Sequence, residues 1–167
     1  KDVLARENVN LAGGSLYALD TEGRELWRVA LGAKRRGVPG PAVSADGTVY
    51  LSVQPAALLA IKPDGAIRWE LPFADAGALS GPAVGADGTV FVVSSHKGLF
   101  AIDAGGSQRW NVPTTPTKLI PGAAPPVIGR DRTIYFADPY ERSVRAVSPE
   151  GRHLWAAPVP AGPERSL

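Results

Sequence analysis

Ala60-Ile-Lys-Pro-Asp-Gly-Ala-Ile-Arg-Trp69 is the stretch that decides the fold, because the chain contains four versions of it. The other three run over residues 18–27, 101–110 and 146–155. In every version an alanine and a tryptophan lie nine residues apart, and a glycine lies four residues before the tryptophan. The tryptophans follow one another at intervals of 42, 41 and 45 residues. This is the spacing of a repeated structural unit and is far too long for the periodicity of a helix or a strand.

Each unit has the pattern of four short antiparallel strands joined by tight turns. The clearest unit starts at Gly40, has an Asp46-Gly47 turn and a β-rich run from Thr48 to Val53, and completes two further strands by residue 71. The same pattern returns from Gly81 onward. No window of helical length has a convincing amphipathic pattern. The sequence therefore predicts an all-β protein.

A four-stranded unit that repeats at this interval is typical of a β-propeller blade, because one small sheet cannot bury both of its faces until neighbouring sheets stack around an axis. We therefore expect a β-propeller of four-stranded antiparallel blades. The expected divisions of this single propeller domain are a partial first blade over 1–31, blades over 40–72, 81–112 and 124–157, and a tail over 158–167.

These divisions amount to about three and a half blades, an incomplete ring, whereas closed propellers typically have four to eight. Either the chain belongs to a longer polypeptide, or a partner covers its open faces. We favour the longer polypeptide, because the chain begins at Lys1 without a methionine or a signal peptide.

The repeated strings resemble a known family. Gly-Pro-Ala-Val-x-Ala-Asp-Gly-Thr-Val occurs over 40–49 and 81–90, and each copy is followed by Leu-x-Ala-Ile and then by glycine and tryptophan. This frame is similar to the quinoprotein-type, or PQQ-like, β-propeller repeat over residues 9–157. The resemblance implies that the outer-strand tryptophan of one blade packs on the next blade and that the alanine keeps the facing position small. The residues concerned are Trp27, Trp69, Trp110 and Trp155, with Ala18, Ala60, Ala101 and Ala146.

Charge and composition exclude several classes of protein. The 18 basic and 16 acidic residues are interspersed and give a net charge of +2, so no nucleic-acid-binding face is expected. The absence of cysteine excludes disulfides and thiolate metal sites. No apolar run approaches the roughly 20 residues of a membrane-spanning helix.

The resemblance raises the hypothesis of a PQQ-dependent dehydrogenase, but the chain departs from those enzymes. It lacks their vicinal cysteine pair and a clustered set of Glu, Asn and Asp that could hold calcium. We therefore expect no catalytic, cofactor-binding or metal-binding residue in this chain. The alternative is a PQQ-dependent or other propeller enzyme whose site lies in blades outside it. The acidic residues at repeat-equivalent turns are expected to cap the backbone, namely Asp20, Asp46, Asp64, Asp87 and Asp103.

Other polar and aromatic candidates give weaker indications. His96 and His153 lie at a hairpin turn and on an outer strand without an adjacent acidic cluster, so a zinc site is not expected. Ser94-Ser95-His96 is a sequence neighbour set rather than a catalytic constellation. A sugar-binding module would have to use Tyr140 and Phe73, which are the loop aromatics.

The function favoured by the sequence is a non-catalytic scaffold that binds other proteins. The resemblance, notably to the lipoprotein of the outer-membrane β-barrel assembly machinery, implies an accessory subunit of an envelope or membrane-associated complex, located in the periplasm or elsewhere outside the cytoplasm. The connections 32–39, 72–80 and 113–123 contain proline, glycine and polar residues and are expected to be surface loops. Of these, the loops 32–39, which contain Lys34-Arg35-Arg36, and 113–123 are the expected contact points. Arginines that recur along the outer strands are expected to form a solvated rim, namely Arg24, Arg68, Arg109 and Arg152.

Overall fold

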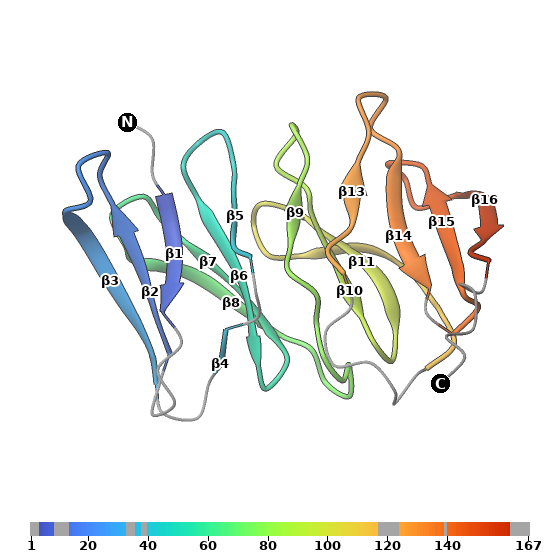
Figure 1. Cartoon of the computed structure of the whole chain (residues 1–167), viewed down its shortest axis with the longest axis horizontal. Helices are drawn as coiled ribbons and strands as arrows, with labels where there is room; N and C mark the ends of the chain where they lie inside the picture. Colours follow the sequence, from blue (N-terminus) through green and yellow to red (C-terminus); the bar gives the residue numbers. More distant parts are fainter. Residues whose placement is uncertain are drawn as a thin grey trace, which may run out of the picture.

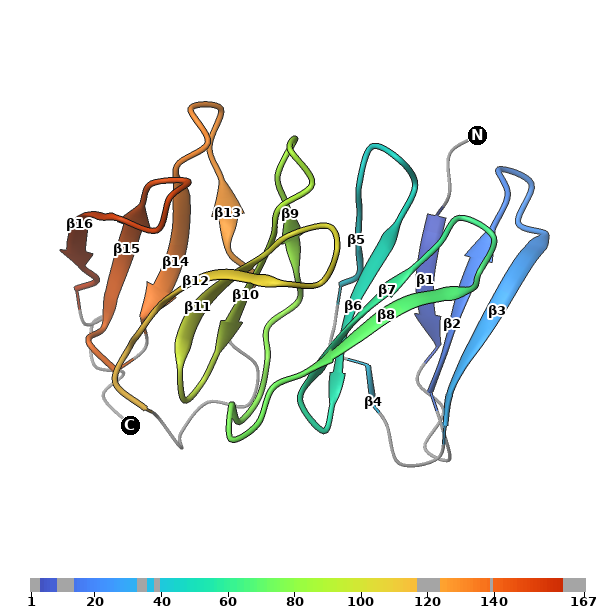
Figure 2. The same ribbon diagram turned by 180° about the vertical axis from the view of Figure 1, so that it is seen from behind.

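The computed structural model describes residues 4–8, 14–32, 36–37, 40–116, 124–138 and 140–160. These ranges contain strands and turns but no helix, so none of the described chain forms a helix that could cross a membrane. The strands build four antiparallel sheets that follow one another across the molecule in chain order (Figure 1). Seen from behind, the first and fourth sheets again lie at opposite ends of the row (Figure 2). The predicted all-β propeller with an open ring is confirmed.

We name the sheets 1 to 4 in chain order. Sheet 1 contains β1 (Leu4–Asn8), β2 (Gly14–Leu19) and β3 (Glu25–Gly32). Sheet 2 contains β4 (Arg36–Gly37), β5 (Ala42–Val43), β6 (Val49–Gln54), β7 (Ala57–Ile61) and β8 (Ile67–Pro72). Sheet 3 contains β9 (Ala83–Val84), β10 (Val90–Ser94), β11 (Gly98–Ile102) and β12 (Gln108–Val112). Sheet 4 contains β13 (Val127–Ile128), β14 (Ile134–Asp138), β15 (Ser143–Val147) and β16 (His153–Pro158).

The strand order runs from a two-residue inner strand to a longer outer strand in sheets 2, 3 and 4. The inner strands β5, β9 and β13 contact one another from sheet to sheet, and the outer strands are β8, β12 and β16. In sheet 1, β1 pairs with β2 from Leu4 opposite Leu19 to Asn8 opposite Ser15. No counterpart of β5 occurs in sheet 1 within the described residues.

Alternating side chains of the middle strands bury both faces of each inner sheet. Val49, Leu51 and Val53 of β6 point toward sheet 1, whereas Tyr50 belongs to the apolar cluster shared with sheet 3. A third cluster joins sheet 3 to sheet 4 through residues such as Phe91. Burial on both faces explains why these strands are nearly continuous apolar runs instead of alternating with polar residues.

The turn aspartates cap the backbone as predicted. Asp64 Oδ1 accepts a hydrogen bond from the amide of Ala66 at 2.9 Å, and Asp46 Oδ1 accepts one from the amide of Thr48 at 3.0 Å. The hydroxyl of Ser44 also donates to Asp46, and this bond is the main reason that the pKa of Asp46 lies below its ordinary value. These carboxylates therefore shape the hairpins, and the capping prediction is confirmed.

Two connections that were expected to be surface loops contain buried residues or a short strand. In the connection 72–80, Phe73, Ala76 and Leu79 are buried in the apolar cluster between sheets 2 and 3, because this cluster offers them apolar partners such as Phe100. Within the expected loop 32–39, β4 pairs with the end of β6, from Arg36 opposite Gln54 to Gly37 opposite Val53. The prediction that these whole stretches are loops is wrong.

Candidate functional site

The repeated tryptophan joins each sheet to the next. Trp69 lies on β8, and its Nε1 donates a 3.0 Å hydrogen bond to the carbonyl of Ala104 in the β11–β12 turn of sheet 3. Its ring covers Gly106 of the same turn so closely that a Cβ there would lie 3.0 Å from Trp69 Cδ2. Gly106 has a φ of +92°, which disfavours any other residue. The repeat glycine thus supplies both the turn and the flat surface for the neighbouring indole.

The other contacts between sheets follow the same rule. Trp27 Nε1 donates to the carbonyl of Pro63 at 2.8 Å, and Trp110 Nε1 donates to the carbonyl of Pro149 at 3.0 Å. Their rings cover the turn glycines of sheets 2 and 4. The packing of these tryptophans on the following blade, which the resemblance implied, is therefore confirmed.

Trp155 differs from the other three tryptophans. It keeps the same tilted contact with a tyrosine, since its ring centroid is 5.8 Å from that of Tyr135, as the Trp69 centroid is from that of Tyr50. However, 45% of its surface is exposed, because no sheet follows β16 within the described residues. At the opposite end of the row, a Cβ on Gly23 would meet no described atom within 4 Å.

The edge at which two neighbouring sheets meet, here called the rim between them, has different residues in the three pairs of sheets. Each pair of sheets has two repeat-equivalent rim positions, one just beyond or at the end of the outer strand of the first sheet and one in the third strand of the second sheet. In successive pairs of sheets they hold Leu31 and Leu59, Phe73 and Phe100, and Thr114 and Arg145.

Between sheets 2 and 3, apolar side chains pack together at these two rim positions. Phe73 and Phe100 meet edge to face, with ring centroids 5.1 Å apart. The connection behind them is fastened by serines, since Ser94 Oγ donates to the carbonyl of Ala76 at 2.6 Å and Ser95 Oγ accepts from the amide of Ala78 at 3.0 Å. Both hydroxyls thus form hydrogen bonds with the backbone of this connection.

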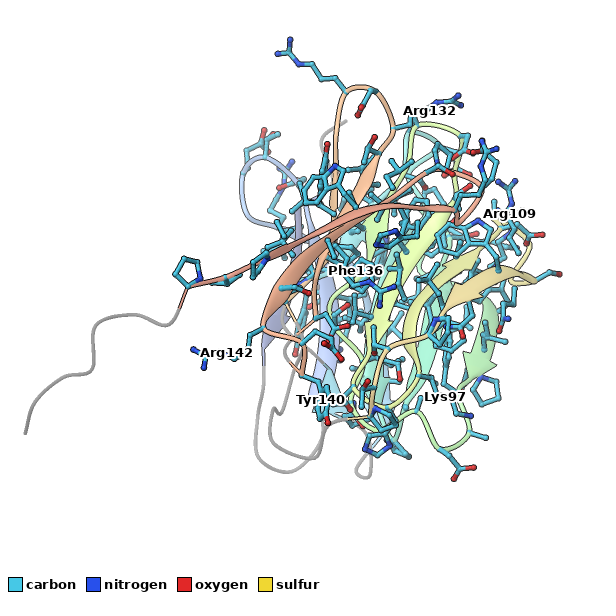
Figure 3. The ribbon with its side chains drawn as sticks, turned by 90° about the vertical axis from the view of Figure 1, so that its right-hand side faces the viewer. Lys97, Arg109, Arg132, Phe136, Tyr140 and Arg142 are labelled. Atoms are coloured by element: carbon cyan, nitrogen blue, oxygen red, sulfur yellow. The ribbon has the colours of Figure 1, made fainter. Side chains whose placement is uncertain are left out.

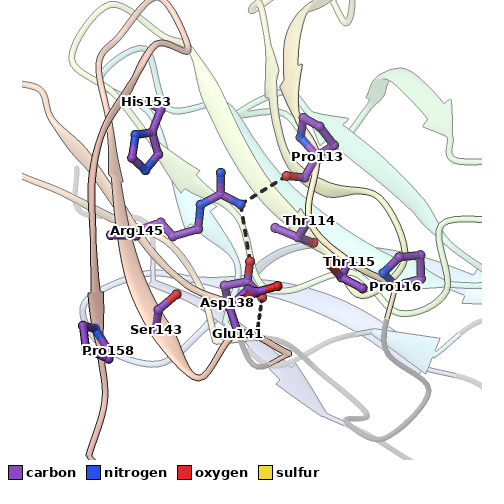
Figure 4. Close-up of a pocket in the computed structure, with 11 residues that line it drawn as sticks. Pro113, Thr114, Thr115, Pro116, Asp138, Glu141, Ser143, Arg145, His153 and Pro158 are labelled. Atoms are coloured by element: carbon purple, nitrogen blue, oxygen red, sulfur yellow. Dashed lines mark hydrogen bonds and ion pairs between the residues drawn. The ribbon is translucent and has the colours of Figure 1, made fainter.

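The rim between sheets 3 and 4 is instead an open groove with a volume of about 630 Å³, and both charged and apolar residues line it. Figure 4 shows the groove between the segment that leaves β12 and the face of sheet 4. The described residues that line it are Pro113, Thr114, Thr115, Pro116, Asp138, Glu141, Ser143, Arg145, His153, Ala156 and Pro158.

An ion pair forms the floor of this groove. Arg145 Nη1 lies 3.3 Å from Asp138 Oδ2 and donates a 3.1 Å hydrogen bond to the carbonyl of Pro113. Asp138 is 1% exposed and also accepts a bond from the amide of Glu141 through Oδ1. The guanidinium carbon of Arg145 lies 5.5 Å from the ring centroid of Phe136. The charged groups are therefore held in place from several sides before any ligand arrives.

Ser143 adds an unpaired hydroxyl to the same groove. Ser143 is 8% exposed, and its buried Oγ has no hydrogen-bond partner among the described residues. Buried hydroxyls normally find a partner, because leaving one unpaired costs the free energy of its desolvation.

The structure separates the two histidines. His96 lies in the β10–β11 turn with Nδ1 3.2 Å from the carbonyl oxygen of Asp75, whereas His153 lines the groove on β16. Within the described residues, no three His, Cys, Asp or Glu side chains come together as a metal site would require.

The remaining predicted candidates divide between exposed and buried positions. Tyr140 is exposed at a hairpin, but Phe73 is buried, so the prediction of two exposed aromatics is wrong for Phe73. Lys34 and Arg35 lie outside the described residues, as do 117–123 of the second contact loop. Figure 3 shows Arg109, Arg132 and Arg142 at the surface of the molecule.

The outer-rim arginines are exposed and form ion pairs with nearby acids. The contacts are 3.9 Å between Arg68 and Asp46 and 3.4 Å between Arg109 and Asp87. Arg24 and Arg152 pair with acidic residues of their own turns. Such exposed pairs stabilise the fold little, and each neutralises part of the positive charge that a binding face for anions would need.

Comparison with known proteins places these features in a family. The model of the family described as outer membrane protein assembly factor BamB matches residues 12–166. The chain belongs to this PQQ-like propeller family. A comparison with curated proteins found no match.

Solved structures support the same fold. BamB from Moraxella catarrhalis superimposes with a TM-score of 0.70 at 18% identity, and the alignment covers 95% of this chain and 51% of that protein. Virginiamycin B lyase from Staphylococcus aureus gives a TM-score of 0.66 at 13% identity over 95% of this chain and 60% of the lyase. BBS1N, crystallised in complex with ARL6DN, gives 0.63 at 15% identity, covering 95% and 50%. The chain thus spans about half the length of the BamB structure.

Sequence reasoning missed the groove, although the repeat frame contained a signal for it. Aligning the units on their tryptophans places Thr114 where sheet 2 is followed by Phe73. Aligning them on their alanines places Arg145 where sheet 3 has Phe100. A polar pair at positions that are otherwise apolar indicates a local difference in function or packing.

Proposed function

We propose that this chain is part of a non-catalytic β-propeller that serves as a protein-interaction scaffold, as an accessory subunit of an envelope or membrane-associated complex on the periplasmic side. The observation that carries the proposal is the match of residues 12–166 to the family of outer membrane protein assembly factor BamB. The BBS1N structure, solved in complex with ARL6DN, adds that a propeller of similar shape can hold a protein partner.

The architecture suits such a role. Indole-to-turn contacts such as that of Trp69 with Ala104 fix each sheet against the next, so the hairpins between strands are held on a firm framework. The groove is lined in part by residues 113–116, which are the described part of the expected contact loop 113–123. We do not infer the activity of the lyase for this chain, because chemistry is determined by the residues of a site and not by the fold that it shares.

Capture of the intact gene product tests this function. The full-length protein would be tagged, cross-linked in its native envelope and purified, with an unrelated exported protein that carries the same tag as the control. We expect a membrane-fraction complex of defined stoichiometry that the control does not form. Recovery of the protein without a partner, together with a change in the absorbance of added PQQ and Ca²⁺, would contradict the scaffold and favour the enzyme alternative.

A further inference from the structure

We propose that the groove between sheets 3 and 4 binds an extended peptide segment of a protein partner and that this segment carries a basic side chain. The inference rests on the proposed function, since it names the chemistry of the partner. Its starting point is the contrast between the rims, because the two other pairs of sheets have apolar residues where this pair has Thr114 and Arg145.

Stability alone does not account for this polar rim. A buried ion pair generally gives no more stability than apolar side chains of similar volume, because both charges must leave water. Asp138 is 1% exposed, and Arg145 keeps only 19% of its side-chain surface exposed. Apolar residues close the equivalent rim between sheets 2 and 3, where Phe73 packs on Phe100. Apolar side chains can therefore fill this rim position, yet the equivalent position between sheets 3 and 4 is a groove that contains charged side chains.

The charges of the groove favour a basic ligand. Asp138 and Glu141 contribute two carboxylates and Arg145 contributes one guanidinium, so these fixed charges sum to one negative charge. Asp138 and Arg145 already bind each other, whereas Glu141 is exposed at the edge of the groove. A lysine or arginine of the partner can pair with Glu141 there without breaking the ion pair below.

The unpaired hydroxyl favours a ligand with backbone amides. Ser143 Oγ can donate to a carbonyl or accept from an N–H, and both groups alternate along an extended peptide. The groove volume of about 630 Å³ lies within the roughly 300–1,000 Å³ of pockets that enclose small ligands, so it accommodates a short segment but not a folded domain. No phenylalanine, tyrosine or tryptophan is among the described residues that line it, so the large stacking surface used for sugars is missing there.

Two variants separate the groove from the rest of the surface. The triple variant Thr114→Phe, Asp138→Ser and Arg145→Phe gives this rim the residues found between sheets 2 and 3. The single variant Ser143→Ala removes the unpaired hydroxyl and is expected to leave the fold intact, since that group has no partner to lose. Arg68→Ala on the outer rim is the matched control.

The test uses a displayed library of random linear peptides, selected on the wild-type protein. We expect enrichment of peptides with lysine or arginine, and a synthetic peptide of the consensus sequence should bind at least about ten-fold more weakly to the triple variant and about three-fold or more to Ser143→Ala. Binding to Arg68→Ala should be unchanged. Selection of no binder, of acidic peptides, or of peptides that bind wild type and both groove variants equally would overturn the proposal.

The same variants distinguish this inference from the proposed function. If the triple variant folds and still captures the full envelope complex, the scaffold role stands and the groove is not its peptide site. If the intact protein forms no complex at all, the proposed function fails, whatever the peptides do.

Discussion

Replacing Gly106 with alanine is expected to undo the docking of Trp69, whereas the same change at Gly23 should introduce only backbone strain. Both glycines have a left-handed φ, +92° and +83° respectively. An L side chain in that conformation costs about 1–2 kcal/mol. At Gly106 the new Cβ would also lie 3.0 Å from the Trp69 ring, but at Gly23 it would meet no described atom within 4 Å. The pair of variants therefore isolates the contact between sheets.

The size of the difference follows from what Trp69 would lose. Moving the ring breaks the Nε1 hydrogen bond to the carbonyl of Ala104, which contributes about 1 kcal/mol. Partial exposure of the half-buried indole costs about 1 kcal/mol more. We therefore expect Gly106→Ala to lower the free energy of unfolding by about 3–4 kcal/mol and Gly23→Ala to lower it by about 1–2 kcal/mol.

Urea denaturation followed by tryptophan fluorescence and far-ultraviolet circular dichroism measures both values. Coincidence of the two probes would establish that a single transition is being compared. Equal losses for the two variants, within about 0.5 kcal/mol, would refute the view that the repeat glycine is the docking surface of the indole.

Three further predictions concern stability. Trp155→Ala should cost at least about 1 kcal/mol less than Trp69→Ala in urea titrations of the 167-residue chain, because none of the described turns covers Trp155, which is exposed. Equal costs would contradict this. Arg132 has a φ of +66° at a turn position that is glycine in sheets 2 and 3. Arg132→Gly should therefore raise the free energy of unfolding by about 0.5–1 kcal/mol in thermal melts. A lower free energy of unfolding would show that the arginine backbone is not strained. The hydroxyl of Ser44 and the Thr48 amide hold the pKa of Asp46 below its ordinary 3.8, so ionised Asp46 stabilises the fold fully above that value and less as pH falls below it. Urea midpoints between about pH 5 and pH 2 should therefore fall less steeply for Asp46→Asn than for the wild type. Identical slopes would show that Asp46 does not contribute to this pH dependence.

The sequence predicts the fold well because its strongest signal is local and repeated. The ten residues from Ala60 to Trp69 contain a strand end, a capped turn and the docking indole, and all of these depend on close neighbours in the chain. The turn of Asp64 and Gly65 requires a left-handed residue, which glycine supplies. Repetition then indicates that sheets stack, because one sheet alone cannot bury its faces.

The candidate site is less predictable because it depends on differences between repeats and on where side chains point. Phe73 lies in what reads as a polar connection, yet it turns inward because Phe100 offers an apolar partner. The repeat pattern gives Arg145 no role, but strand alternation directs its side chain toward sheet 3 and Asp138. The free hydroxyl of Ser143 depends on the positions of every neighbouring polar group, which no sequence pattern specifies.

Photo-crosslinking from the groove in living cells tests the central claim, that this propeller holds a protein partner, most directly. A photoreactive residue would replace Thr115, which is exposed and lines the groove, in the full gene product, and Arg28 on the outer strand of sheet 1 would be the control position. We predict one discrete cross-linked protein from position 115, weakened by the triple variant and not formed from position 28. No product at position 115, or the same products from both positions, would contradict the account.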